Sequence, residues 1–234
     1  MSATNAPYDA STRTLSEAES KRFLEPFGLP IAPERVAATA AEAAQAATEI
    51  GFPVVAKLCG DAIAHKTERG LVRLNLRDAA AAEHAASQLL AAARPEDGQV
   101  GVLVAPMVAG TREFIAGLSH DAQFGMTVMV GVGGVLAEAI ADVAIGLVPI
   151  TTGDAHSMID SLESQALLGP FRGEPAVDRD ALAATLVALS DAATERPDLV
   201  SVDLNPLIIS DGAPVAVDAL VEVRCAAESQ EGTH

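Results

Sequence analysis

Residues 54–76, VVAKLCGDAIAHKTERGLVRLNL, contain two apolar runs separated by a polar segment. The first run, VVAKL, is typical of a buried strand, and the last, LVRLNL, alternates like a strand with one exposed face. The polar segment between them carries one histidine, His65. The stretch therefore predicts two strands joined by a loop, and it leaves open whether His65 is a solvated loop residue or a reactive one.

Patterns on both sides of this stretch extend the prediction along the chain. The sequence SEAE from Ser16 fits a capping box, so a helix is expected to begin there and to end at Gly28. The last part of the chain predicts a strand, a turn at Asp211 and Gly212, and a second strand. Between these ends, helices are expected at 40–50, from 78, at 154–168 and at 178–195, and strands at 100–108, 111–119 and 124–132, with a hairpin turn at 119–123. The pattern predicts an α+β chain with two lobes that meet near 105–110, where a ligand would bind.

The composition argues against several classes of function. Half of the 234 residues are hydrophobic, but the formal net charge is −17 at pH 7, which disfavours nucleic acid and anionic membranes as partners. Only 3% of the residues are aromatic, which leaves little for base stacking. Without a bilayer-spanning apolar run or a signal-peptide pattern, a cytoplasmic location is expected. Cys59 and Cys225 are expected to be ordinary thiols.

Two features could bind phosphate. Lys57 lies near the end of a strand of aliphatic residues, where it could snorkel to solvent or direct its charge at phosphate oxygens. The sequence GVGG at 131–134 follows a strand, and its amide groups could form an anion-binding nest, although a glycine-rich hairpin also serves packing. Each feature by itself leaves both interpretations open.

Three oxygen-bearing side chains are predicted to converge near the C-terminus, in VDLNPL and VAVDA. Asp203 and Asn205 are two residues apart on a strand and share a face, and Asp218 on the paired strand can face them. Carboxylates gathered on an apolar hairpin need a counter-charge, and a Mg²⁺ that also contacts phosphate suits that geometry. The alternative is an Asn-Pro turn in which the Asp caps the backbone.

His65 has neither a Cys nor a second His near it in sequence, which argues against a metal site. Histidines in loops are commonly solvated, but imidazole is also a nucleophile toward phosphorus and forms a labile phosphoramidate. Twelve residues separate Leu58 from Leu71. A loop of this length, hinged at Gly60 and Gly70, could carry the histidine on the order of 20 Å.

Six segments, taken together and in order, resemble the ATP-grasp chain of ADP-forming acyl-CoA synthetases, which is called the beta subunit where the enzyme has two polypeptides. This chain is distantly similar to the beta chain of succinyl-CoA synthetase. The resemblance covers about 16–223 and implies an ATP-grasp fold with the nucleotide between two lobes. We expect lobes at 16–104 and 105–224, a disordered segment at 1–15 and a flexible tail at 225–234. The segments are VVAKL, AHKTERGLV, VLVAPMVAGTREFIAGL, FGMTVMVGVGGVLAEAIADV, LLGPFRG and VDLNPLII with VAVDA.

The resemblance implies the reaction carboxylic acid + CoA + ATP = acyl-CoA + ADP + phosphate. It assigns the last phosphoryl transfer, between ADP or ATP and a histidine of the partner, to His65 on a swinging loop. Asp203 would meet the partner's phosphohistidine, and Asn205 and Asp218 would hold Mg²⁺. The nucleotide would be bound by Lys57, Val104, Ala105, Pro106, Met107, Glu113, Gly133 and Gly134. The acid and CoA would bind to a CoA-binding alpha subunit, in a heterotetramer.

The sequence departs from the family pattern at one hinge. Many members have HKTDxGGV, whereas this chain has HKTERGLV, with Leu71 in place of a second glycine. The change would stiffen the loop and leave the histidine intact. Two alternative functions stay open: a non-catalytic ATP-grasp module of an acetyltransferase-like assembly, which would be expected to have lost the histidine, lysine or metal pair, and a stand-alone ATP-grasp ligase, which would need an acceptor domain.

Overall fold

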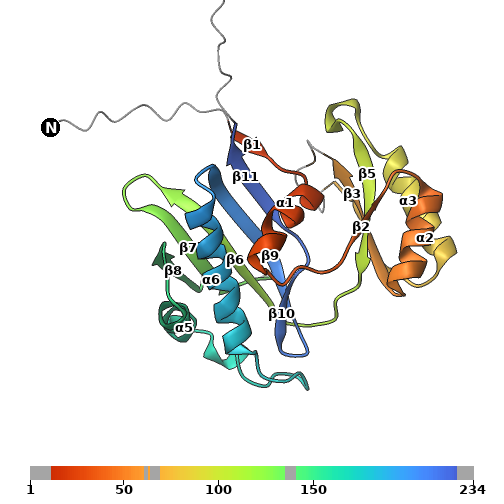
Figure 1. Cartoon of the computed structure of the whole chain (residues 1–234). Coiled ribbons are helices and arrows are strands. Elements are labelled where there is room, and N and C mark those ends of the chain that lie inside the picture. The colour runs from red at the N-terminus through yellow and green to blue at the C-terminus, as the bar shows by residue number, and fades with distance from the viewer. Residues whose placement is uncertain (1–11, 61–62, 64–68, 135–140, 226–234) are drawn as a thin grey trace, which may run out of the picture.

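The chain forms two lobes, each built on one antiparallel sheet (Figure 1). The computed structural model describes residues 12–60, 63, 69–134 and 141–225. The smaller lobe has a four-stranded sheet in the order β2-β5-β3-β4, and two helices pack against it. Its elements are β2 (Arg35–Ala37), α2 (Ala40–Ile50), β3 (Val54–Gly60), β4 (Val72–Leu76), α3 (Ala79–Ala91), η2 (Pro95–Asp97) and β5 (Val100–Pro106).

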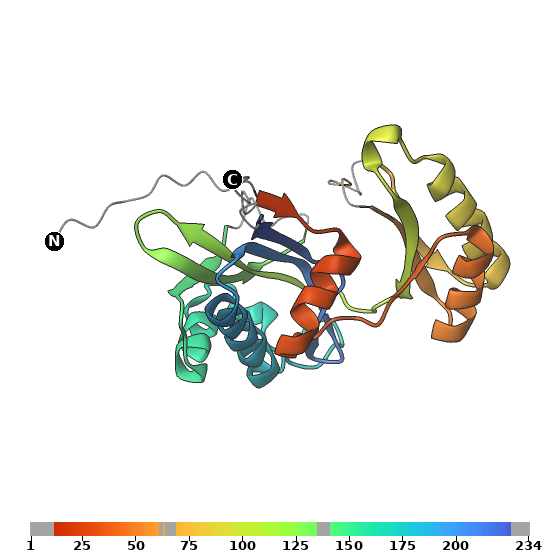
Figure 2. The same cartoon turned by 45° about the horizontal axis from the view of Figure 1, so that its top comes forward.

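The larger lobe has a seven-stranded sheet in the order β1-β11-β9-β6-β7-β8, with β10 paired to β9. Helix α6 packs against β6 and β7, and α5 packs against β8, so both helices lie on one side of the sheet (Figure 2). The elements are β1 (Thr12–Thr14), β6 (Glu113–Asp121), β7 (Gly125–Val132), β8 (Val143–Leu147), α5 (Thr152–Ser161), η3 (Gln165–Leu167), α6 (Arg179–Glu195), β9 (Leu199–Ser210), β10 (Ala213–Ala216) and β11 (Leu220–Arg224).

The N-terminal helix belongs to the larger lobe, which corrects the predicted boundaries. Helix α1 (Glu17–Leu24) and the short helix η1 (Glu25–Phe27) follow β1, which pairs with β11. Leu15, Leu24 and Leu29 are buried in the hydrophobic core of the larger lobe. The smaller lobe therefore begins near β2, and Thr12–Thr14 is a strand rather than part of a disordered segment. Helix α1 lies between the two lobes (Figures 1 and 2).

Local sequence signals account for most of the elements. The capping box at Ser16 is present, and Gly28 ends the helical segment with a positive φ of 75°. Strand β6 runs on to Asp121, so the hairpin turn is shorter than predicted. The predicted helix at 154–168 is broken after α5, because Leu162 is extended and the Asp142 carboxylate accepts the backbone N–H groups of the next two residues.

The alternation of side chains along β3 determines which residues face the larger lobe. Val54, Ala56 and Leu58 are buried against α2 and α3 in the core of the smaller lobe. Val55 and Cys59 lie on the opposite face and pack with Ala18 of α1. Because side chains alternate along a strand, the side chain between Val55 and Cys59, that of Lys57, also faces α1 and the space between the lobes. Of the helices in the described part of the chain, none is long and apolar enough to cross a membrane.

Candidate nucleotide site between the lobes

A cavity of about 560 Å³ lies between the two lobes and brings together residues that are distant in sequence. The smaller lobe contributes the faces of β3 and β4, and the larger lobe contributes the start of β6 and the segment between β10 and β11. The connection from β5 to β6 forms another wall. The lining includes Lys57, Gly70, Ala105, Pro106, Met107, Glu113 and Asp218. Most of the predicted nucleotide-binding residues thus share one cavity.

Lys57 is buried, and its ammonium group is held by the larger lobe. Nζ donates to Oε1 of Glu17 at 2.7 Å and to the carbonyl of Val217 at 2.8 Å. Oδ2 of Asp218 lies 3.7 Å from the same nitrogen. Lys57 does not snorkel to solvent, because the space around it is closed by α1 and by the bend at 217–218. Its charge lies at the cavity wall, next to a predicted metal ligand.

The four predicted nucleotide-binding residues at 104–107 divide into two groups. Ala105, Pro106 and Met107 line the cavity. The side chain of Val104 is buried, and its backbone pairs with β2 on one side and β3 on the other. Strand β2 begins opposite Val104, so it does not extend along Ala105 and Pro106. A base would therefore be read by the residues after Val104, where the sheet leaves backbone facing the cavity.

Glu113 and the two glycines are neighbours at the other side of the cavity. Glu113 begins β6 and lines the cavity, and its carbonyl accepts the N–H of Gly133 at 2.8 Å. A Cβ on Gly134, which has a φ of 84°, would lie 3.5 Å from Oε2 of Glu113. The amide of Gly133 is thus used inside the protein and is not available to a phosphate. Of the two glycines predicted to bind the nucleotide, Gly134 is the one next to the carboxylate of Glu113, which lines the cavity.

Asp203 and Asp218 lie close enough for their charges to interact, although Asp218 is not on a strand. Asp203 pairs with Leu220 of β11, and Leu207 pairs with Ala216 of β10, so the bend that carries Asp218 lies opposite the strand segment with Asn205. Burial by the surrounding protein raises the pKa of Asp203, and the negative charge of Asp218 raises it further. Two carboxylates without a cation between them repel each other, which is the cause of the second effect.

This donor set fits a magnesium ion that keeps part of its water shell. In the described ranges, no group of three or more His, Cys, Asp or Glu side chains is placed to hold a metal. Asp203, Asn205 and Asp218 supply two carboxylates and one amide. Mg²⁺ commonly takes one or two protein carboxylates and completes its shell with water and phosphate oxygens. The residues present suit that arrangement, and Nζ of Lys57 lies 3.7 Å from Oδ2 of Asp218.

His65 lies outside the described residues, but both ends of its segment are defined. Gly60 ends β3, and a Cβ there would lie 2.9 Å from the carbonyl oxygen of Gln99, so this glycine is required for close packing. Gly70 has a φ of 65° and lines the cavity. Leu71 is buried in the core of the smaller lobe, and its carbonyl accepts the N–H of Leu58 at 3.0 Å. The position of Leu71 is therefore fixed by packing.

A partly buried ion pair holds the chain just before Gly70. The guanidinium of Arg69 donates two hydrogen bonds to the carboxylate of Asp97, at 2.7 and 2.9 Å. The Asp97 carboxylate also accepts the backbone N–H of Arg94 at 2.8 Å. These donors lower the pKa of Asp97 to about 2, with the Arg69 hydrogen bond as the largest cause. We call Arg69 and Asp97 the loop-base pair.

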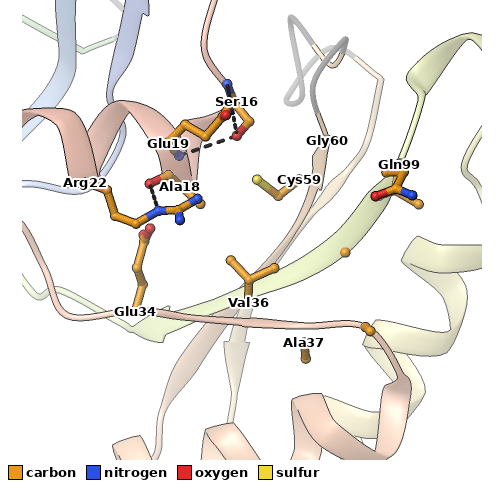
Figure 3. Close-up of a pocket in the computed structure, with 13 residues that line it drawn as sticks. Ser16, Ala18, Glu19, Arg22, Glu34, Val36, Ala37, Cys59, Gly60 and Gln99 are labelled. Atoms are coloured by element: carbon orange, nitrogen blue, oxygen red, sulfur yellow. Dashed lines mark hydrogen bonds between the residues drawn. The ribbon is translucent and has the colours of Figure 1, made fainter.

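A second cavity, of about 570 Å³, lies on the other side of α1 (Figure 3). The side chains of Arg22 and Glu34 reach into the space between α1 and β2, and the thiol of Cys59 faces the same space (Figure 3). Cys59 is buried and Cys225 is exposed, and neither of them forms a disulfide. None of the predicted site residues within the described ranges lines this cavity, so the cavity that contains Lys57 is the candidate functional site.

The sequence analysis missed a group of buried charges beside the site. Glu17 and Lys21 were predicted only to lie in the helix that begins at Ser16, but both are buried and both contact residues at the junction of the lobes. Their i, i+4 spacing on the face of α1 that also buries Ser20 and Leu24 was a usable signal. A charge at an apolar position of an amphipathic helix needs a partner elsewhere in the fold. The partner itself could not be named from the sequence.

The chain has two lobes, each built on an antiparallel sheet, and a cavity between them that is lined by a buried lysine and by carboxylates. This arrangement is typical of a nucleotide-binding protein of the ATP-grasp type. The family model described as "ATP-grasp domain" matches residues 7–223. The acetate–CoA ligase [ADP-forming] I subunit beta of Pyrococcus furiosus is 36% identical over 213 residues, with 90% of this chain and 92% of the relative covered.

Solved structures of one archaeal protein agree with this match. The dinucleotide-forming acetyl-coenzyme A synthetase 1 of Ca. Korarchaeum cryptofilum, in complex with coenzyme A and Ca-AMPCP, has a TM-score of 0.86 at 34% identity, covering 91% of this chain and 94% of the other. A second structure of it, with Mg-AMPPCP and a phosphohistidine segment pointing towards the nucleotide binding site, has a TM-score of 0.79 at 34% identity, covering 91% and 93%. The chain belongs to the ATP-grasp family, in the group that contains the beta subunits of ADP-forming acetate–CoA ligases.

Proposed function

We propose that this chain is the nucleotide-binding subunit of an ADP-forming acyl-CoA synthetase and that it passes a phosphoryl group between ADP or ATP and a partner subunit through His65. One observation carries the proposal. Lys57, Glu113 and Asp218 line one cavity, and the segment with His65 leaves the end of β3 and returns at Gly70, which lines the same cavity. The assignment agrees with the ATP-grasp beta subunits among its relatives.

Each group around the cavity has a role in this reaction. The backbone after Val104 would bind adenine, Glu113 the ribose, and Lys57 the phosphate oxygens. Mg²⁺ held by Asn205 and Asp218 would supply positive charge to the phosphate oxygens. A ring nitrogen of His65 forms a bond to the γ-phosphorus while the bond from that phosphorus to the bridging oxygen breaks, which leaves ADP. Asp203 would stabilise the partner's histidine during the next transfer.

Detection of phosphohistidine tests this proposal. The purified chain, incubated with Mg²⁺ and ATP labelled at the γ-phosphate, is expected to acquire label that is labile to acid and stable to base. His65→Ala should abolish the label, whereas His84→Ala, which changes a histidine on the outer side of α3, should retain it. Label that survives His65→Ala would refute the role of His65. A chain that binds nucleotide and is never labelled would favour the non-catalytic ATP-grasp module.

The proposal also includes a partner. A CoA-binding alpha subunit would carry the acid, CoA and the first phosphohistidine, and the assembly would work in the cytoplasm, as the sequence pattern suggests. Co-purification of the chain from its native extract should recover this partner. The recovered complex should then form acyl-CoA from ATP, CoA and at least one acid of a panel of short, branched and aromatic carboxylic acids. A complex inactive with every acid, although labelled at His65, would contradict the ligase assignment.

A further inference from the structure

We propose that Glu17 is a positioning residue of the nucleotide site, and that its buried carboxylate holds the ammonium group of Lys57 at the phosphate end of the cavity. The inference rests on the proposed function, because contact between Lys57 and phosphate is part of that function. It assigns a role in the site to the N-terminal helix α1, which supplies none of the residues that line the cavity.

The Glu17 carboxylate is shared by two lysines. Its side chain is fully buried, and Oε1 accepts from Lys57 at 2.7 Å and from Lys21 at 2.9 Å. The carbonyl of Val217 accepts from the same two lysines, at 2.8 Å from Lys57 and 3.2 Å from Lys21. Oε2 of Glu34 accepts from Lys21 at 2.6 Å. We call Glu17, Lys21, Glu34 and Lys57 the junction cluster.

The junction cluster, together with the Val217 carbonyl that accepts from both of its lysines, joins three elements that are far apart in the chain. Glu17 and Lys21 lie on α1, Lys57 lies on β3 of the smaller lobe, and Val217 lies in the bend next to Asp218. The charges balance, with two carboxylates and two ammonium groups. Burial lowers the pKa of Lys21, but the carboxylates of Glu17 and Glu34 outweigh this effect and raise it overall. Lys21 therefore stays charged and keeps Glu17 in place.

The geometry leaves one direction of the Lys57 ammonium group for a ligand. An ammonium group has three N–H donors. Within the described residues, Glu17 and Val217 take two of them, and the remaining contact is the Asp218 carboxylate at 3.7 Å, beyond hydrogen-bond distance. The donor that remains can bind a phosphate oxygen at the cavity wall. Glu17 would thus not contact the nucleotide itself, but would orient the ammonium group of Lys57, which contacts the nucleotide.

Removal of the Glu17 charge should move Lys57. Its strongest acceptor would be lost, while the neighbouring ammonium group of Lys21 would repel it. The negative charge of Asp218, which lies 3.7 Å from Nζ, would attract Lys57 toward the predicted metal site. A displacement of about 1 Å in a positioned group can cost on the order of 100-fold in rate. A purely structural role for Glu17 predicts instead a general loss of stability that does not discriminate between parts of the ligand.

Binding of ADP and of adenosine to Glu17→Gln separates these two roles. Equilibrium titrations with each ligand, without added metal, would measure both affinities in the full chain. We expect affinity for ADP to fall by about 10- to 100-fold, the range found when a group that orients a ligand-binding side chain is removed. Affinity for adenosine should change less than twofold, because the base-binding backbone after Val104 is untouched. Equal affinity of wild type and variant for ADP would overturn the inference.

Two further variants serve as controls. Glu19→Ala removes the two hydrogen bonds that the Glu19 carboxylate accepts from the backbone N–H and the hydroxyl of Ser16, and neither involves Lys57. It should therefore lower the melting temperature and leave both affinities unchanged. If Glu17→Gln fails to fold, Glu17→Gln with Lys21→Met removes one charge of each sign and keeps the cluster neutral. This double variant should still show the selective loss for ADP, and wild-type affinity for ADP in it would overturn the inference.

Lys57→Ala separates failure of this inference from failure of the proposed function. If wild type binds ADP and Lys57→Ala weakens binding, the proposed site is supported, and an unchanged affinity in Glu17→Gln then overturns the positioning role alone. If wild type does not bind ADP, or if Lys57→Ala binds it as tightly as wild type, the proposed function and the positioning role are both overturned.

Discussion

The junction cluster and the loop-base pair are both sets of ion-paired side chains that are wholly or partly buried, but they connect different parts of the molecule. Arg69 and Asp97 lie within the smaller lobe, and the Asp97 carboxylate is fully satisfied by a bidentate guanidinium and one backbone N–H. In the junction cluster, one carboxylate oxygen of Glu17 serves two lysines, one from each lobe.

The difference suggests how each set is used. A locally completed pair holds its own chain segment, here the end of the segment that carries His65, and needs nothing from a ligand. A cluster shared between lobes retains a donor that faces the cavity, and it places Lys57 relative to Asp218. Buried ion pairs are often no more stabilising than apolar groups of the same size. We therefore expect the junction cluster to matter more for ligand binding and the loop-base pair more for stability.

The largest expected effect is loss of phosphoryl transfer in Lys57→Ala. Removal of one preorganised charge-stabilising group commonly costs about 10²- to 10³-fold in rate. The rate of His65 labelling from Mg-ATP would be measured at saturating nucleotide, with circular dichroism and melting temperature as controls for folding. A rate within twofold of wild type would show that the junction cluster has only a structural role, which would remove the contrast between the two sets of charges.

The loop-base pair should make the unfolding free energy depend on pH in the acid range. The folded-state pKa of Asp97 is about 2, below its ordinary value of 3.8, so its ionised form stabilises the fold above about pH 4. This contribution is lost as pH falls from about 4 to about 2. Denaturant unfolding of wild type and Asp97→Asn across this range should give a difference in unfolding free energy that is constant near neutral pH and shrinks in acid.

An unchanged difference across the acid range would show that Asp97 does not have the lowered pKa. Adenosine affinity is a useful control in the same variant, because the pair lies away from the base-binding backbone. We expect it to equal that of wild type at pH 7. A large loss of adenosine affinity would show that the loop-base pair is coupled to the nucleotide site, as the junction cluster is.

A smaller effect is expected at the two glycines that flank the His65 segment. Gly60→Ala would place a Cβ 2.9 Å from the Gln99 carbonyl oxygen and 3.0 Å from that of Asp97, so it should cost about 1–3 kcal/mol of unfolding free energy through overpacking. A Cβ at Gly70 would meet no atom of the described residues within 4 Å, but its φ of 65° is strained for alanine, and a cost of about 1 kcal/mol is expected for Gly70→Ala. Urea unfolding would measure both.

Comparing the loss of stability with the rate of His65 labelling in each variant distinguishes a packing role of the glycine from a hinge role. If Gly60 serves as a hinge rather than as a packing residue, Gly60→Ala should slow His65 labelling more than it lowers stability. If the sequence interpretation of Gly70 as a hinge is right, Gly70→Ala should slow labelling at nearly unchanged stability. Equal labelling rates in both variants and wild type would limit the moving part to residues between Gly60 and Gly70.

Much of the fold could be predicted because its signals are local. The capping box at Ser16, the N-cap at Asp78 and the turn at Asp211 and Gly212 are all formed within a few residues, and they are present in the structure. The apolar run at 54–58 predicted β3, in which Lys57 is the one charged side chain. The predicted start of the smaller lobe was wrong because it depends on where α1 packs, and nothing in the order of elements shows that β1 pairs with β11.

The sequence by itself determined the helices and strands, the candidate phosphate-binding lysine and the acidic group near the C-terminus, because periodicity, caps and turn residues act over short distances. Only the tertiary structure decided which charges meet. Glu17 lies 40 residues from Lys57 in the chain, and Lys57 lies 160 residues from Val217. Contacts over such separations are fixed by how the two sheets pack around α1, so the partner of Lys57 could be found only in the folded molecule.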